Sequence, residues 1–366
     1  MHQKTAKTIL DHFEDTYRGR RVLVTGHTGF KGSWLGFWLA DMGAEVAGYA
    51  LDPAEGRGNF KEAGLHGLLA LDERGDVRDA EHLRGVVEDF RPDIIFHLAA
   101  QPLVRLSYAE PLYTFDTNIR GTANLLEAVR LVGRACSVVV VTSDKCYENR
   151  EVDYAYRETD PMGGHDPYSA SKGCAELVAA AYRASYFAGG GAVRLATARA
   201  GNVIGPGDWA ADRIVPDAVR ALSEGRVLNV RNAQAVRPWQ HVLEPLSGYL
   251  LLGKLLAEGK DVAESWNFGP SPASKHTVGE LADLFCQEWG DGASWQTEPP
   301  PSGLHEAHLL QLSIEKAARR LDWHPRWGFE TTIRRTANGY KRLLAAGSAE
   351  EARKFLREEI GAYTEK

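Results

Sequence analysis

The chain has 366 residues, of which 44% are hydrophobic and 25% charged, and its formal net charge is −6. An acidic balance excludes an electrostatic nucleic-acid binder, which needs a basic surface. No apolar run reaches the roughly 18 residues of a membrane-spanning helix, and the N-terminal segment, with Asp11 and Glu14, lacks the features of a secretory signal. Four cysteines without a C-x-x-C pair form no disulfide framework, so we expect a cytoplasmic protein.

The first predicted strand, Arg21–Thr25, leads through Gly-His-Thr-Gly-Phe-Lys-Gly into an apolar helix from Trp34 to Met42. The pyrophosphate of a dinucleotide needs such a turn. Gly26 permits a tight bend, Gly29 lets the backbone approach the phosphates, and Gly32 lets helix and strand pack closely. The helix N-terminus then presents free N–H groups to the anion.

Asp52 lies twenty residues after Gly32, beyond the second predicted strand, Glu45–Tyr49. A carboxylate there hydrogen-bonds the adenosine ribose and repels a 2′-phosphate, so NAD is expected rather than NADP. His27 and Lys31 stand where small or apolar residues are common. One possibility is that these two residues have no effect on cofactor binding. The other is that Lys31 acts on the pyrophosphate, either attracting it by charge or obstructing its close approach by bulk.

Strand-like runs alternate with helical segments through the first 200 residues or so. This alternation predicts an α/β fold, a Rossmann-type doubly wound parallel sheet with ligands at the carboxyl ends of its strands. From Gly205 the segments become short and rich in glycine, proline and tryptophan. We therefore expect an NAD-binding domain over 1–204 and a smaller mixed α/β substrate-binding lobe over most of 205–366, with a return to the sheet around 236–269. The other predicted strands are Leu68–Leu71, Ile94–Leu98, Ser137–Thr142 and Val193–Ala198, and the predicted helices include Ala80–Phe90, Thr114–Val132 and Ser169–Phe187.

Tyr168 and Lys172 are four residues apart, so they share one face of a predicted helix. A nearby ammonium lowers the pKa of a phenol, and the tyrosinate can then take a proton from a sugar hydroxyl while hydride leaves the carbon. Ser143 follows the end of a predicted strand and can hydrogen-bond the reacting hydroxyl or carbonyl. Asp144 and Lys145 come directly after it.

Ser143, Tyr168 and Lys172 together make the catalytic set of the short-chain dehydrogenase/reductase superfamily, and the chain resembles its extended branch over nearly the whole length. Three segments look like nucleotide-sugar-modifying members: His97–Gln101, Thr117–Thr122 and Ala200–Gly205. Four others are similar to the CDP-glucose 4,6-dehydratases: Gly26–Gly32, Ser143–Tyr147, Arg237–His241 and His305–His308.

The resemblance implies a hydro-lyase with tightly held NAD that converts CDP-D-glucose to its 4-keto-6-deoxy product, in deoxysugar biosynthesis for surface polysaccharide such as lipopolysaccharide O-antigen. Tyr168 deprotonates the C4 hydroxyl and hydride passes to NAD⁺. The ketone acidifies C5–H, water leaves across C5 and C6, and hydride returns to C6. Asp144 is the expected acid for the C6 hydroxyl, so it must hold its proton at neutral pH. Related dTDP-sugar dehydratases have an Asp-Glu pair, but here Lys145 is either a neutral base or a cation that stabilises the enolate.

Arg213 and Arg237 are the candidates for the substrate's diphosphate, because a guanidinium grips phosphate with two hydrogen bonds. Asn202 suits a phosphate or ribose oxygen, and His305 and Glu306 the nucleoside. Cytosine itself is implied by resemblance alone. The expected substrate residues are Gln101, Asn202, Arg213, Arg237, His305 and Glu306. The expected cofactor residues are Gly26, His27, Gly29, Phe30, Lys31, Gly32, Asp52, Asp76, Leu98, Ala99, Ala100, Tyr168 and Lys172. No metal site stands out.

Two other functions stay open beside a 4,6-dehydratase of this or another sugar nucleotide. A 4-epimerase on the same scaffold needs Ser143, Tyr168 and Lys172 but has no use for Asp144. A non-catalytic NAD-binding sensor can lose the tyrosine or lysine, whereas both are present here. In the superfamily, the helices corresponding to Thr114–Val132 and Ser169–Phe187 pair across a two-fold axis. A homodimer is therefore expected; the alternative is that their apolar faces are internal core.

Overall fold

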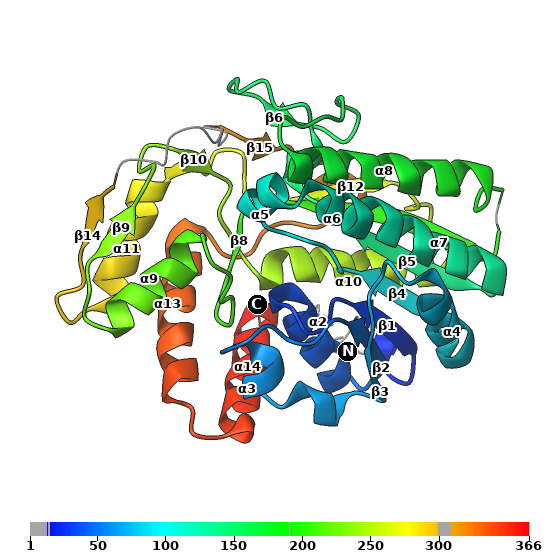
Figure 1. Ribbon diagram of the computed structural model, residues 1–366, viewed down its shortest axis with the longest axis horizontal. Coiled ribbons are helices and arrows are strands. Elements are labelled where there is room, and N and C mark those ends of the chain that lie inside the picture. Colours follow the sequence, from blue (N-terminus) through cyan, green and yellow to red (C-terminus); the bar gives the residue numbers. More distant parts are fainter. Residues whose placement is uncertain (1–12, 14, 190, 299–308, 366) are drawn as a thin grey trace, which may run out of the picture.

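The computed structural model describes residues 13, 15–189, 191–298 and 309–365. Its centre is a seven-stranded sheet in the order β12-β7-β5-β4-β1-β2-β3 (Figure 1). Every neighbouring pair runs parallel, which confirms the predicted doubly wound α/β fold. The strands are β1 (Arg21–Thr25), β2 (Glu45–Ala50), β3 (Leu71–Arg74), β4 (Ile94–His97), β5 (Cys136–Val141), β7 (Val193–Ala200) and β12 (Ser265–Phe268).

Helices cover both faces of the sheet, because its strands are apolar on both sides. In β5, Val139 and Val141 join the core on one face, and Val138 and Val140 join the core on the other. The first face is covered by α2 (Phe30–Asp41), α10 (Leu243–Ala257), α12 (Glu315–Leu321) and α14 (Ala349–Thr364). The second is covered by α4 (Ala80–Phe90), α7 (Gly121–Val132) and α8 (Pro167–Ser185).

A separate hydrophobic core lies beside the sheet, where α9 (Ile214–Ser223), α11 (Val278–Trp289) and α13 (Phe329–Ala345) meet (Figure 1). The chain after Gly205 does not build this separate core alone. Its elements α10, β12, α12 and α14 return to the sheet and join the core on the first face. Short strand pairs are β8 (Val203–Ile204) with β11 (Gln240–His241), β9 (Leu228–Val230) with β14 (Trp295–Thr297), β10 (Val236–Arg237) with β13 (His276–Thr277), and β6 (Ala155–Tyr156) with β15 (Gln311–Leu312). Three shorter helices are α3 (Asn59–Glu62), α5 (Val104–Ala109) and α6 (Pro111–Phe115).

One predicted strand was wrong. Residues 68–71 were expected to form it, but β3 begins at Leu71, and Leu65–Leu68 form a 3-10 turn whose Leu65 is buried. The strand is hard to recognise because it lies at the sheet edge, pairs only with β2 and carries polar residues.

The helix that carries the tyrosine and lysine begins earlier than predicted. Pro167 takes the first turn of α8, and Asp166 caps it by accepting a hydrogen bond from the Ser169 N–H at 2.9 Å. The helix expected over Thr114–Val132 contains a π-helical turn at Asp116–Arg120. In the part of the chain that the structure describes, no helix is long and apolar enough to cross a bilayer.

Candidate active site

The glycine turn between β1 and α2 has the geometry that a dinucleotide pyrophosphate needs. Gly26 adopts a φ of +75°, and a Cβ there would lie 2.8 Å from the Ala99 nitrogen. A Cβ on Gly32 would lie 2.1 Å from the Gly26 oxygen, so only glycine fits either position. Gly29 caps α2 without a side-chain hydrogen bond, and the first turn carries no acidic residue. The helix N-terminus is therefore suited to an anion.

His27 and Lys31 have different surroundings, although both belong to this turn. His27 is buried against Gly48, and its Nε2 lies 2.7 Å from Asp72 Oδ1, so it anchors the turn to β2 and β3. Lys31 lines the cavity described below. Burial, followed by repulsion from Lys172, lowers the pKa of Lys31 to about 7.

Two expected cofactor residues, Asp52 and Asp76, lie at the carboxyl ends of β2 and β3. Asp52 is 89% exposed, and its Oδ1 lies 3.3 Å from Nε of Arg74, a cation that sequence reasoning missed. Asp76 is held by Arg78, whose side-chain hydrogen bonds keep the pKa of the carboxyl below its usual value. The loop Leu98–Ala100 continues from β4 and passes directly beside Gly26.

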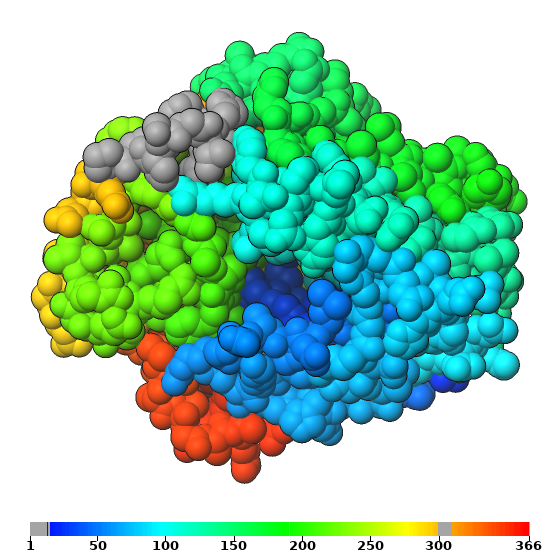
Figure 2. Space-filling view, in the orientation of Figure 1, coloured from blue at the N-terminus to red at the C-terminus, as the bar shows by residue number. Residues whose placement is uncertain are grey.

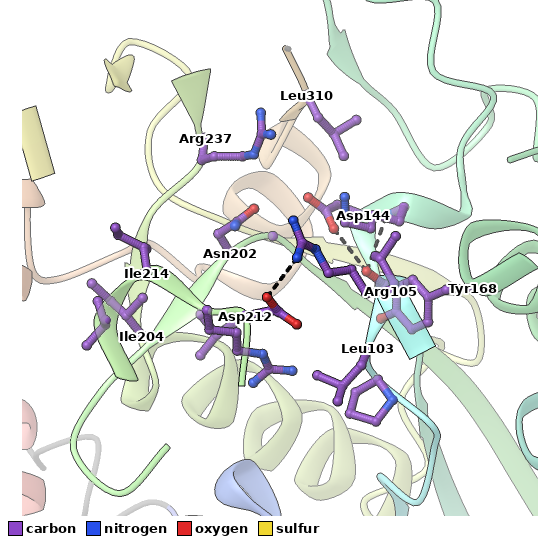
Figure 3. Close-up of a pocket in the computed structure, with 18 of the residues that line it drawn as sticks. Leu103, Arg105, Asp144, Tyr168, Asn202, Ile204, Asp212, Ile214, Arg237 and Leu310 are labelled. Carbon is purple, nitrogen blue, oxygen red and sulfur yellow. Dashed lines mark hydrogen bonds and ion pairs between the residues drawn. The ribbon is translucent and has the colours of Figure 1, made fainter. Parts of the chain in front are cut away.

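Ser143, Asp144 and Tyr168 form a connected group. Ser143 Oγ donates to Asp144 Oδ1 at 2.9 Å, and its hydroxyl is also hydrogen-bonded to Tyr168. Burial raises the pKa of Tyr168 to about 12, although the bond to Ser143 lowers it. Figure 3 shows Asp144 and Tyr168 on the same side of the cavity.

Asp144 has the setting of a carboxylic acid that keeps its proton. It is 3% exposed, and no described residue hydrogen-bonds its buried Oδ2. Burial raises its pKa and outweighs the opposing effects of Lys145 and Ser143. Lys172 is also buried, which lowers its pKa to about 8, and its Nζ lies 3.5 Å from the Val141 carbonyl oxygen.

A cavity of about 720 Å³ lies at the carboxyl side of the sheet, between the sheet and the separate core of α9, α11 and α13. Figure 2 shows the molecule hollowed at its centre, with the dark blue early part of the chain at the floor. The cavity brings together expected residues that are far apart in sequence. Those that line it are Phe30, Lys31, Ser143, Asp144, Lys145, Tyr168, Asn202, Arg213 and Arg237.

Gln101, expected at the substrate, does not line the cavity. Its side-chain nitrogen donates to Thr114 Oγ1 at 2.8 Å and its oxygen accepts from the Leu103 N–H, so it supports its own loop. His305 and Glu306 lie outside the described residues. Among the residues described, no cluster of histidine, cysteine and carboxylate side chains is placed to hold a metal ion.

The cavity also contains charged residues that were not predicted from the sequence. Asp208 accepts a hydrogen bond from the expected Arg213 at 2.8 Å, and Asp212 accepts hydrogen bonds from both Arg105 and Arg231. Arg105 follows the end of β4, where ligand-binding loops gather, so its place in the chain was a usable signal.

Known proteins match the chain over most of its length. The model of a family described as GDP-mannose 4,6 dehydratase matches residues 23–336. The chain is 51% identical over 330 residues to a CDP-glucose 4,6-dehydratase of Salmonella typhimurium, covering 89% of this chain and 91% of the relative. It is 31% identical to a dTDP-glucose 4,6-dehydratase of Streptomyces griseus, covering 74% and 80% of the two chains.

Solved structures have the same fold. A dTDP-glucose 4,6-dehydratase of Streptomyces venezuelae, solved with NAD, superposes with a TM-score of 0.72 at 26% identity over 94% of this chain and 98% of that one. An epimerase of Methanothermobacter thermautotrophicus gives 0.78 at 26% identity, over 94% and 97%. Fold alone therefore does not separate the two activities. Because the family model and the relative with 51% identity both span most of the sequence, the chain belongs to the GDP-mannose 4,6 dehydratase family.

Proposed function

We propose that this protein is an NAD-dependent lyase that converts CDP-D-glucose to CDP-4-keto-6-deoxy-D-glucose. The observation that carries the proposal is the buried carboxyl of Asp144, hydrogen-bonded to Ser143 in the cavity that also contains Tyr168. An epimerase needs the serine and tyrosine but no acid beside them. The Salmonella relative, named CDP-glucose 4,6-dehydratase, supports the same substrate.

The residues divide the reaction between them. Tyr168 takes the proton of the C4 hydroxyl while Ser143 holds that oxygen. NAD⁺, which the glycine turn and Asp52 would hold, would supply the hydride acceptor for C4 and the hydride donor for C6. Asp144 protonates the departing C6 hydroxyl as the C5 proton is removed, so one water leaves across C5 and C6. A proton returns to C5 when C6 receives its hydride, which completes the 4-keto-6-deoxy sugar. Lys145 lines the cavity and acts at C5, either as a neutral base or as the cation beside the enolate.

Arg213 and Arg237 are the proposed contacts of the diphosphate, and Asn202, which lies near Arg237 in Figure 3, lines the same cavity. Their positive charges offset the charge of the diphosphate. The glycine turn and Asp52 are the proposed NAD contacts, which matches the cofactor named for the Streptomyces venezuelae structure. The product then supplies deoxysugar biosynthesis for surface polysaccharide.

We also propose a cytoplasmic homodimer that pairs through α7 and α8. Leu177 on α8 is 60% exposed and Leu131 on α7 is 51% exposed, whereas Leu125 is buried in the core of its own chain. Unpaired cysteines suit a reducing compartment. Light scattering should give a dimer mass, and Leu177→Glu should shift it toward the monomer.

Product analysis tests the proposed activity. The protein is incubated with CDP-glucose and NAD, and the sugar nucleotide is examined by mass spectrometry and NMR. A 4-keto-6-deoxy product is expected. A C4 epimer would make the protein an epimerase, and absence of turnover with any of the CDP, dTDP, GDP and UDP sugars would point to an NAD-binding sensor.

A further inference from the structure

An ion-pair cluster crosses the cavity. Arg105, on α5, reaches over the cavity to Asp212, which lies just before α9 (Figure 3). Its Nη1 lies 3.0 Å from Asp212 Oδ1, and Nη1 of Arg231 lies 2.9 Å from the same oxygen. All three residues line the cavity. One carboxylate therefore joins cations from both sides of the cavity.

Asp212 is held in front of the cavity by its backbone as well as by its charge. It adopts a φ of +62°, in the left-handed region that aspartate and asparagine tolerate better than most residues. Its side chain is 44% exposed, and those of Arg105 and Arg231 are 28% and 27% exposed. Water and ligands can therefore reach the cluster, and an asparagine at this position keeps the same backbone.

The position of Asp212 conflicts with the charge of the proposed substrate. A nucleoside diphosphate brings negative charge into the cavity, where a fixed carboxylate repels it. Carboxylate and phosphate oxygens are also alternative acceptors for the same guanidinium. Arg105 and Arg231 thus donate hydrogen bonds to the carboxylate of Asp212, at a place where the diphosphate of the substrate is expected.

We propose that Asp212 is an internal competitor of the substrate's diphosphate, and that Arg105 and Arg231 exchange it for phosphate oxygens when a nucleoside diphosphate sugar binds. This inference rests on the proposed function in taking a nucleoside diphosphate as ligand. It adds two binding residues to Arg213 and Arg237. It also assigns to Asp212 the role of weakening the binding of phosphates, which sets the affinity and eases product release.

Equilibrium binding of CDP to the NAD-loaded protein, measured by calorimetry, tests the exchange, with uncharged cytidine as the reference ligand. Asp212→Asn should bind CDP about 3- to 10-fold more tightly, because the competitor loses its charge. Arg105→Met should bind CDP about tenfold more weakly, because a charge-assisted contact is lost. Cytidine binding should be unchanged in both variants, and thermal melts establish that each is folded.

Matched controls separate local exchange from net charge. Asp291→Asn removes one negative charge at another exposed aspartate with positive φ, 54°, and lies outside the cavity lining. Arg319→Met removes one cation from a side chain that is 80% exposed on α12. Neither should alter CDP affinity by more than about twofold at physiological salt, because screening weakens distant exposed charges.

A double variant distinguishes exchange from a simple strut. If Arg105 contacts phosphate, Arg105→Met should still weaken CDP binding when Asp212 is already asparagine. If Arg105 merely bridges to Asp212, its replacement should have no further effect in that background. That result overturns the proposal, and so does an Asp212→Asn variant whose CDP affinity falls or stays the same.

Failure of the proposed function would be seen separately. The exchange concerns phosphates and not the base, so the same pattern is measured with GDP, UDP and dTDP. If CDP-glucose is not turned over but Asp212→Asn tightens the binding of another nucleoside diphosphate, the proposed function fails and the exchange stands. If no nucleoside diphosphate responds to either variant, the exchange is refuted, whatever the product assay gives.

Discussion

Glu176 and Arg199 form an ion pair of 2.8 Å with side chains only 3% and 2% exposed. Glu176 lies one turn beyond Lys172 on α8, and its carboxylate also accepts a hydrogen bond from Thr142 at 2.5 Å. Burial raises the pKa of Glu176, but Arg199 and the hydrogen bonds prevail and hold it below its usual value. Because Thr142 directly precedes Ser143, the pair fixes α8 against the strand end that carries the serine.

Glu176→Gln should therefore destabilise the fold by about 3–5 kcal/mol, because the buried charge of Arg199 is left without its partner. Denaturant unfolding measures the change. The matched control is Glu224→Gln, which breaks an ion pair with Arg226 in which both side chains are 61% exposed. It should cost about 0–1 kcal/mol. If the two variants lost the same free energy of unfolding, the buried ion pair would contribute no more to stability than the exposed one, which contradicts the prediction.

Tyr168→Phe should lower the single-turnover rate of NADH formation by about 10²–10⁴-fold, because the base for C4 is removed. Burial raises the pKa of Tyr168 to about 12 in the protein without ligands, so the charges of Lys172 and NAD⁺ are needed to lower it. NAD affinity should stay nearly intact. Tyr154→Phe, at a 41% exposed tyrosine outside the cavity lining, is the control. Near-normal turnover of Tyr168→Phe with saturating NAD would refute the role.

Asp144→Asn should separate the half-reactions, because an amide cannot protonate the departing hydroxyl. Oxidation at C4 needs only Ser143, Tyr168, Lys172 and NAD⁺. NADH absorbance should therefore build up in a single turnover with little 6-deoxy product. Normal-rate dehydration by this variant would overturn the assignment of the acid.

The unmutated protein provides the companion measurement. Deuterium placed at C4 of the sugar should reappear at C6 of the same molecule, since the cofactor stays bound between the two hydride transfers. Loss of the label to solvent or to added NAD would contradict this mechanism.

Asp52→Ala should weaken NAD binding and strengthen NADP binding. Ribose hydrogen bonds are lost, and Nε of Arg74, now 3.3 Å from Asp52 Oδ1, becomes available to a 2′-phosphate, while Nη1 and Nη2 of Arg74 stay hydrogen-bonded to Asp72. Fluorescence titration of both cofactors measures the change. In Asp52→Ala combined with Arg74→Met the gain in NADP affinity should disappear. Unchanged affinities for both cofactors in the single variant would mean that Asp52 does not face the ribose.

Glu244 on α10 should make the protein less stable as pH rises. Its buried carboxyl accepts hydrogen bonds from the Trp327 N–H at 2.7 Å and the Tyr363 hydroxyl at 2.8 Å, but burial raises its pKa to about 7. The unfolded chain ionises near pH 4.3, so the folded state binds the extra proton between these values. The free energy of unfolding should fall from about pH 4.5 to 7, by up to about 3 kcal/mol from this group.

Urea unfolding at pH 5 and pH 8 tests this effect. The Glu244→Gln side chain cannot ionise. The free energy of unfolding of this variant minus that of the unmutated protein should therefore be larger at pH 8 than at pH 5. Glu350→Gln, at an exposed glutamate in the first turn of α14, should show no such dependence. A difference between Glu244→Gln and the unmutated protein that is the same at both pH values would contradict the prediction.

Features written in a few neighbouring residues were predictable from sequence. The strand-turn-helix at Gly26 to Gly32 depends on steric limits that only glycine meets. The shared face of Tyr168 and Lys172 follows from helix periodicity. The parallel sheet was predictable because its buried strands are short apolar runs that alternate with helical segments. The edge strand β3 has little apolar surface to bury, and it was placed three residues too early.

Long-range pairing was decided only by the tertiary structure. Arg105 and Asp212 are 107 residues apart, and nothing in either segment indicates that they meet. The sequence likewise could not show that Gln101 turns into its own loop while Lys31 faces the cavity. Motifs identify which chemical groups are present, because they reflect local backbone geometry. Which groups meet, and which are buried enough to change their pKa, depends on how distant elements pack and exclude water.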